Sequence, residues 1–402
     1  MYLESHMNIA RFVFASIAVA LAGCNPITKS GMEAREQAYS RMDRTNAGIA
    51  HKQASDAFQT GQLDKARQLI TKGIERYAQD ADSWALLGRI LMEQTRLDQA
   101  VLALNKAIEL DPDNATSHYF LGVIFERWSK DGQAASYYQG AFAAAPEKPQ
   151  YLMAAAEALI ASGDVLAAET LLNSNLARFE HHAAMQHLLA HIAMLQNDAE
   201  TASLRCEEAR LLAPEDESIA RDLCRMRFRN GQWAGCIDAI EDWQARFGGD
   251  DLALDHVLAR CLVLVSRHNQ ARSSYRALCE GDPENDTLWR ERGLLAWSQQ
   301  DWQTLENCTG QLETLQPSMY ESTLFRAVCA REQGEASQAK ALLEGLIEAY
   351  PDRSEAWTLL ASLRASAGDL SGAAKARQIA VKCDPAMADQ PRVTGVFGAK
   401  GP

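Results

Sequence analysis

The sequence predicts an all-α protein in which short helix-turn-helix repeats stack on one another along the chain. Small residues recur at intervals of 34 residues. Between them, apolar residues fall three and four apart, as on one face of a helix. Prolines that end helices recur in the same register. One such pair of helices cannot cover its own apolar faces, so it must stack on copies of itself.

The clearest copy runs from Ala81 to Asn114. Its apolar and small residues at helical spacing are Trp84, Leu87, Gly88, Leu91, Ala100, Leu104 and Ala107. A polar turn over residues 95–98 separates two short helices. Pro112 ends the second helix, because proline has no N–H to donate and clashes with the preceding turn.

The positions of Gly88 and Ala100 are where we expect the two helices of a repeat to approach most closely, so larger side chains would separate them. The first-helix position reads Ala54, Gly88, Gly122, Ala156, Ala190, Cys224, Ala259, Gly293, Ala327 and Ala361. The second-helix position reads Ala66, Ala100, Ala134, Ala168, Ala202, Cys236, Ala271, Leu305, Ala339 and Ala373. Ten repeats follow: 47–80, 81–114, 115–148, 149–182, 183–216, 217–251, 252–285, 286–319, 320–353 and 354–387. Repeat six is one residue longer and lacks the stop proline.

This pattern resembles the tetratricopeptide repeat (TPR) family, whose repeats are 34 residues long. The resemblance implies a TPR solenoid, a right-handed superhelix whose first helices line a concave groove for protein segments. The repeats leave no room for a separate catalytic domain. The sequence has no nucleophile elbow, no glycine-rich phosphate loop, no HExxH and no CxxC. We therefore expect no enzyme activity and no cofactor.

The first 23 residues have the proportions of a signal peptide. Met7 is the better start, since Arg11 supplies a basic residue before an apolar run over 12–22 that is too short to span a bilayer. The run ends in Leu21-Ala22-Gly23-Cys24, which resembles the lipobox of bacterial lipoproteins. That resemblance implies lipid on Cys24, and Asn25 implies an outer-membrane lipoprotein facing the periplasm. The alternative is an ordinary secretory signal that ends in cysteine.

Residues 24–46 are predicted to be a polar tether and a lead-in helix that starts near Met32. The C-terminal tail, 388–402, has turn residues and no helical period. With 53 acidic and 40 basic residues, the chain carries a net charge of −13. This charge gives no general attraction for nucleic acid.

Eight cysteines lie in the repeats, and an oxidising periplasm would favour their pairing. Cys224 and Cys236 occupy the two close-approach positions of repeat six, which makes them the preferred disulfide. Cys206 competes for Cys224, and Cys308 and Cys329 form a further possible pair. The alternative is that all of them are small buried apolar residues.

Four histidines cluster in the middle of the chain: His181, His182, His187 and His191. His187 and His191 are one helical turn apart, a spacing that could hold zinc. No carboxylate or thiolate in the sequence pattern completes a set of ligands, so we expect no metal and interpret the cluster as exposed helix histidines.

The family's groove positions are residues 2, 5, 9, 12 and 13 of each repeat. Carried onto this chain, they predict a basic, partly aromatic centre for the groove. Its residues are His187, His191, Arg221, Arg225, Phe228, Arg229, His256, Arg260, Arg290 and Trp297. Arginine suits bidentate contacts with carboxylates, so the expected partner is an acidic protein segment. Local salt bridges along this face are the alternative.

These features favour a non-catalytic scaffold that is anchored in the bacterial outer membrane. By architecture it resembles repeat lipoproteins that assist pilus, exopolysaccharide or secretion machines, and its partner is expected among envelope components. One alternative is a metal- or small-ligand-binding module, or an enzyme accessory, that uses the His181–His191 cluster. Another is a soluble periplasmic adaptor of chaperone type.

Overall fold

The computed structural model describes residues 29–384, and every regular element in that range is a helix. The described residues form two compact units, 29–178 and 179–384. They are the N-terminal and the C-terminal unit. The predicted all-α TPR solenoid fold is confirmed. The predicted signal peptide, Cys24 and the tail 388–402 lie outside the described residues.

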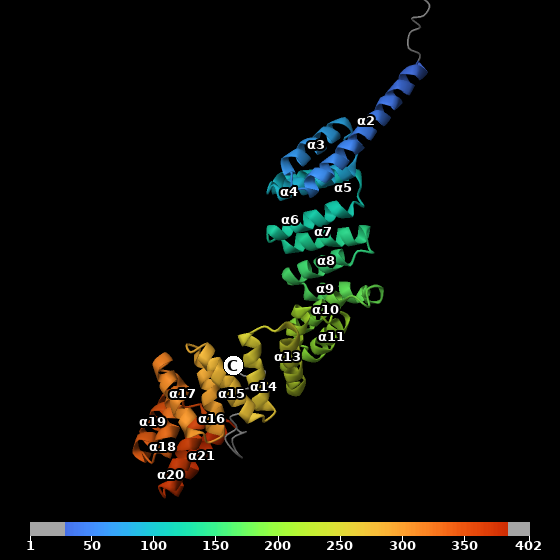
Figure 1. Cartoon of the computed structure of the whole chain (residues 1–402). Coiled ribbons are helices and arrows are strands. Elements are labelled where there is room, and N and C mark those ends of the chain that lie inside the picture. The colour runs from blue at the N-terminus through green and yellow to red at the C-terminus, as the bar shows by residue number, and fades with distance from the viewer. Residues whose placement is uncertain (1–28, 385–402) are drawn as a thin grey trace, which may run out of the picture. The chain divides into compact units, whose positions relative to one another are not determined.

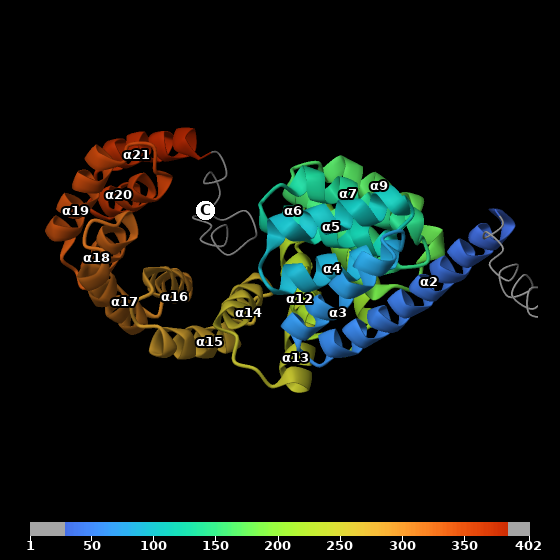
Figure 2. The same cartoon turned by 90° about the horizontal axis from the view of Figure 1, so that it is seen from above.

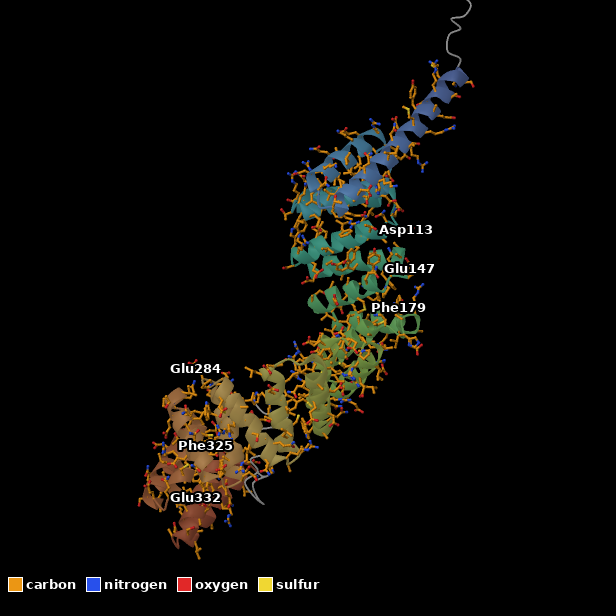
Figure 3. The ribbon with its side chains drawn as sticks, viewed as in Figure 1. Asp113, Glu147, Phe179, Glu284, Phe325 and Glu332 are labelled. Atoms are coloured by element: carbon orange, nitrogen blue, oxygen red, sulfur yellow. The ribbon has the colours of Figure 1, made fainter. Side chains whose placement is uncertain are left out.

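The N-terminal unit is a stack of antiparallel helix pairs (Figure 1). Its helices are α2 (Lys29–Gln59), α3 (Leu63–Arg76), α4 (Ala81–Glu93), α5 (Leu97–Leu110), α6 (Ala115–Arg127), α7 (Asp131–Ala144), α8 (Pro149–Ala161), α9 (Val165–Ser174) and the short 3-10 helix η1 (Leu176–Arg178). The expected lead-in segment and the first helix of repeat one form a single helix, α2, with no break between them. Asp113 and Glu147, labelled in Figure 3, follow the stop prolines at two turns on the same edge of the stack.

The C-terminal unit continues the same pattern. Its helices are α10 (Ala183–Leu195), α11 (Ala199–Leu212), α12 (Glu217–Arg229), α13 (Trp233–Phe247), α14 (Leu252–Leu264), α15 (His268–Gly281), α16 (Asp286–Ser298), α17 (Trp302–Leu315), α18 (Tyr320–Glu332), α19 (Ala336–Ala349), α20 (Ser354–Ser366) and α21 (Leu370–Cys383). Figure 2 shows α16, α18 and α20 on the inner side of an arc, with α17, α19 and α21 outside them. Neighbouring first helices also contact one another directly, as in α12 with α14 and α18 with α20. The first helices therefore form the inner face of this unit.

The small residues lie where the helices approach most closely. All twenty close-approach positions are buried. A Cβ atom on Gly88 would lie 2.5 Å from Leu104 Cγ and 3.4 Å from the Ala100 carbonyl oxygen. A Cβ atom on Gly122 would lie 2.5 Å from Tyr138 Cε1. The two 2.5 Å distances are too short for carbon atoms, so these two helix pairs can approach this closely only without a Cβ atom at residues 88 and 122.

Each repeat turns between its two helices through one residue with positive φ. These residues are Gly61, Thr95, Ser129, Gly163, Asn197, Gly231, Ser266, Gln300, Gly334 and Gly368. In repeat two, Thr95 N–H donates to the Met92 carbonyl and Arg96 N–H donates to the Leu91 carbonyl, both at 2.9 Å. This is the Schellman arrangement, which satisfies the last carbonyl groups of the first helix.

The extra residue of repeat six lies in α13, which has 15 residues where the second helices of neighbouring repeats have 14. No proline ends α13. Instead Gly248 adopts φ 62°, and its N–H donates to the Gln244 carbonyl oxygen. Glycine can end the helix in this way because it has no Cβ atom to oppose the left-handed conformation.

Among the described residues, no helix combines the length and apolar character that crossing a bilayer requires.

Candidate functional site

The side chains of His187, His191 and Asp222 meet on the inner face of the C-terminal unit. His187 and His191 lie one turn apart on α10, and Asp222 comes from α12 of the next repeat. Asp222 Oδ2 lies 3.0 Å from His187 Nε2 and 3.1 Å from His191 Nε2. The two Nε2 atoms are themselves 3.1 Å apart. The three donor atoms thus form a nearly equilateral triangle.

This cluster is held in place by neighbouring contacts. Arg225 Nη1 donates to Asp222 Oδ1 at 3.2 Å, so the other carboxylate oxygen faces the two imidazoles. Hydrogen bonds from His187 and His191 hold the pKa of Asp222 well below its usual range. Only 17% of the Asp222 side chain is exposed, whereas 45% of the His191 side chain is exposed. The carboxylate is therefore shielded, and the cluster opens to solvent beside His191.

Three of the four arginines of α12 pair with carboxylates, namely Arg221, Arg225 and Arg227. Arg221 lies 2.6 Å from Glu217 and 3.3 Å from Asp251, and its guanidinium covers the Trp243 ring. Arg225 pairs with Asp222, as described above. The side chain of Arg225 remains half exposed, and Arg229 is exposed. The predicted basic stripe exists, but local salt bridges offset much of its charge, as the alternative interpretation held.

A second cluster joins repeats seven and eight around the buried carboxylate of Glu291. His256 Nε2 lies 2.6 Å from Glu291 Oε2, and Tyr275 Oη donates to the same oxygen at 2.8 Å. Arg260 Nε lies 3.8 Å from the other oxygen. Burial and the neighbouring Glu291 carboxylate raise the pKa of Tyr275 well above its usual range. The predicted groove residues His256 and Arg260 therefore support a buried carboxylate.

The predicted aromatic contacts differ in their exposure. Phe228 is only 8% exposed. The Arg260 guanidinium lies over its ring, with Arg260 Cζ 5.0 Å from the ring centroid. Its ring fills the core, so its predicted role in contacting a partner was wrong. Trp297 is half-buried and packs edge-on against Phe325, and Arg290 is half-buried as well.

The described structure does not contain the disulfide expected between Cys224 and Cys236, since all eight cysteines of the described repeats are free thiols. The Cys236 thiol donates to the Cys224 carbonyl oxygen at 3.2 Å. A hydrogen bond with the Cys261 thiol, together with burial, raises the pKa of Cys236 well above its usual range. The register of repeat six correctly predicted that the two backbones lie close together. The Cys236 thiol, however, forms hydrogen bonds with the Cys224 carbonyl and with the Cys261 thiol of repeat seven.

Sequence reasoning missed Asp222 and Glu291. Both occupy position 6 of their repeats, which is outside the five groove positions carried over from the family. Both pair with the residue 35 positions earlier, at position 5 of the preceding repeat. Tyr320 and Glu355 show the same 35-residue separation. A search for complementary residues at that separation would have found Asp222.

Comparison with known proteins agrees with the geometry. A family model described as TPR repeat matches residues 88–127, and one described as tetratricopeptide repeat matches residues 315–388. These two segments of the chain match the tetratricopeptide repeat. These TPR matches fall in both compact units.

Among curated proteins, the mitochondrial import receptor subunit TOM70 of Rattus norvegicus is 28% identical over 81 residues, which are 20% of this chain. The match spans 13% of the length of TOM70. Among solved structures, PilF of Pseudomonas aeruginosa is 18% identical with a TM-score of 0.38, covering 61% of this chain and 96% of that one. PilW, a type IV pilus biogenesis factor, is 16% identical with a TM-score of 0.43, covering 51% and 95%. At these identities, none of the three assigns a partner to this chain.

Proposed function

We propose that this TPR protein is a non-catalytic scaffold that binds an acidic segment of a cell-envelope assembly or secretion component. We further propose that lipid on Cys24 anchors it in the outer membrane, facing the periplasm. The observation that supports binding most strongly is the inner face of α12, which presents exposed arginine side chains. TPR solenoids bind protein partners through this face, and the stacking of repeats gives it the length of an extended peptide.

The charge carried by α12 itself favours an acidic partner, although Asp251 and Glu207 of neighbouring elements also pair with its arginines. The helix carries four arginines against two carboxylates. Arg225 uses one of its five N–H donors on Asp222, and the others can reach a partner's carboxylate. Such contacts are exposed, and salt screens them over about 8–10 Å at physiological ionic strength. Binding of the partner should therefore weaken as salt rises.

A double charge reversal tests the binding face. We expect Arg225→Glu with Arg229→Glu to abolish recovery of the partner from envelope extracts. Both exposed guanidinium groups are then replaced by carboxylates, which repel an acidic segment. The matched control is Arg276→Glu with Arg377→Glu, which makes the same change of charge at exposed positions on the second helices α15 and α21. Capture that survives the first variant, or is lost equally in the control, would show that the inner face of α12 is not the binding surface.

The anchor is tested separately through Cys24. Wild-type protein should partition into detergent, and Cys24→Ala should remain unprocessed or appear in the soluble periplasmic fraction. Identical fractionation of the two would refute the lipid anchor and leave the soluble periplasmic adaptor as the working function. Partner capture by the Cys24→Ala protein distinguishes failure of the anchor from failure of binding.

A further inference from the structure

The Nε2 atoms of His187 and His191 and the Oδ2 atom of Asp222 converge on one point between α10 and α12. We propose that these three side chains bind one divalent transition-metal ion of the Zn²⁺ class. This proposal is independent of the proposed scaffold function, since it concerns neither the lipid anchor nor the acidic partner. It also revises the sequence-based expectation that the histidine cluster holds no metal.

The separations of the three donor atoms fit a metal ion. Zinc binds imidazole nitrogen and carboxylate oxygen at about 2.0–2.1 Å, which places neighbouring ligands about 2.9 Å apart in octahedral geometry and about 3.3 Å apart in tetrahedral geometry. The observed separations are 3.0, 3.1 and 3.1 Å. An ion about 1 Å above the plane of the three donor atoms would therefore lie about 2.0–2.1 Å from each of them without rearrangement.

Hydrogen bonds alone cannot satisfy this arrangement. Each Nε2 carries at most one proton, so three short contacts share at most two protons. If both imidazoles donate to Asp222, the contact between His187 Nε2 and His191 Nε2 at 3.1 Å sets two donors against each other. If one imidazole is unprotonated at Nε2, that nitrogen faces the carboxylate oxygen with a lone pair on each side. A central cation accepts all three lone pairs at once.

The protein holds the three side chains in this position through its packing. His187 and His191 flank the buried pair Leu189 and Ala190 on α10, and Asp222 precedes the buried Leu223 on α12. The hydrogen bond from Arg225 fixes the carboxylate, as outer-shell partners commonly do for metal ligands.

Two imidazoles favour zinc and its neighbours over Mg²⁺ and Ca²⁺, which prefer oxygen ligands. Three protein ligands leave at least one coordination position open. That position faces solvent beside the half-exposed His191, where water or a donor group of a bound molecule can occupy it.

The test titrates Zn²⁺ into the full-length chain, purified in detergent without a polyhistidine tag and stripped with a chelator. Calorimetry should find one equivalent bound to wild type. His187→Ala, His191→Ala and Asp222→Asn should each weaken binding by more than about tenfold, since even outer-shell partners carry about 10–100-fold. Circular dichroism of Asp222→Asn checks that this nearly isosteric variant keeps its helices. Unchanged affinity in a folded Asp222→Asn protein would overturn the proposal.

The chain offers two matched controls. His256→Ala removes a histidine that pairs with a carboxylate at the same 35-residue separation but has no second imidazole beside it. His181→Ala with His182→Ala removes the rest of the histidine cluster. Both should keep wild-type affinity, and an equal loss in either would identify adventitious binding. Bound Co²⁺ should lack the intense thiolate charge-transfer absorption, whose appearance would assign the metal to cysteines and refute the site.

Discussion

Tyr138 shows how a single side chain determines how closely two helices pack. Its ring lies where a Cβ atom on Gly122 would be, and its hydroxyl donates to Glu126 Oε2 at 2.6 Å. The ring is almost fully buried, so it cannot move aside without losing that bond and its packing. The absence of a side chain at residue 122 is therefore a packing requirement of the α6–α7 pair.

We expect Gly122→Ala to lower the free energy of unfolding by about 1–3 kcal/mol, the usual cost of forcing extra atoms into a packed core. Urea unfolding followed by circular dichroism measures this. Gly310→Ala is the matched control, because the space around Gly310 in α17 is empty within 4 Å. That control should stabilise the protein by about 0.5–1 kcal/mol through helix propensity. Equal effects of the two variants would contradict the packing explanation.

The cysteines give a second prediction for single residues. Burial raises the pKa of Cys206, Cys224 and Cys308 to about 12. At pH 8 these thiols are almost entirely protonated, and only the thiolate reacts with alkylating reagents. Among the eight repeat cysteines, we therefore expect only the half-exposed Cys383 to be alkylated in the folded protein.

After denaturation without a reductant, all eight should be alkylated, as mass spectrometry would show. Protection of Cys224 and Cys236 in the denatured protein would instead reveal the disulfide predicted from the sequence.

At the scale of the elements, the junction after α13 depends on the left-handed conformation of Gly248. A side chain there should cost about 1–2 kcal/mol, because the left-handed region crowds Cβ against the following carbonyl oxygen. We expect Gly248→Val to lower the urea midpoint accordingly. The reverse change, Ser266→Gly, removes the strain of a positive φ of 61° at the turn between α14 and α15. It should raise the urea midpoint. A neutral Gly248→Val variant would show that this junction does not need the left-handed cap.

At the scale of the whole molecule, the sequence predicted the fold almost completely. The recurrence of small residues predicts which helices pair, because close approach excludes large side chains at fixed positions. The side-chain contacts of the inner face were predicted only in part. The positions of His187 and His256 on first helices followed from the register, but the carboxylates that pair with them, Asp222 and Glu291, lie at position 6. Such pairs depend on the angle between neighbouring repeats, and spacing within one repeat carries no information about that angle.

Position 5 of one repeat pairs with position 6 of the next, so the proposed metal site could be reproduced in another pair of repeats. Repeats seven and eight already contain His256 and Glu291 in that relation, and Arg260 occupies the place that His191 has in repeat five. Arg260→His would complete the same set of ligands one repeat pair further along. If the stacking geometry alone creates the site, this variant should bind a second equivalent of Zn²⁺. Metal centres could then be built into the chain at intervals of two repeats.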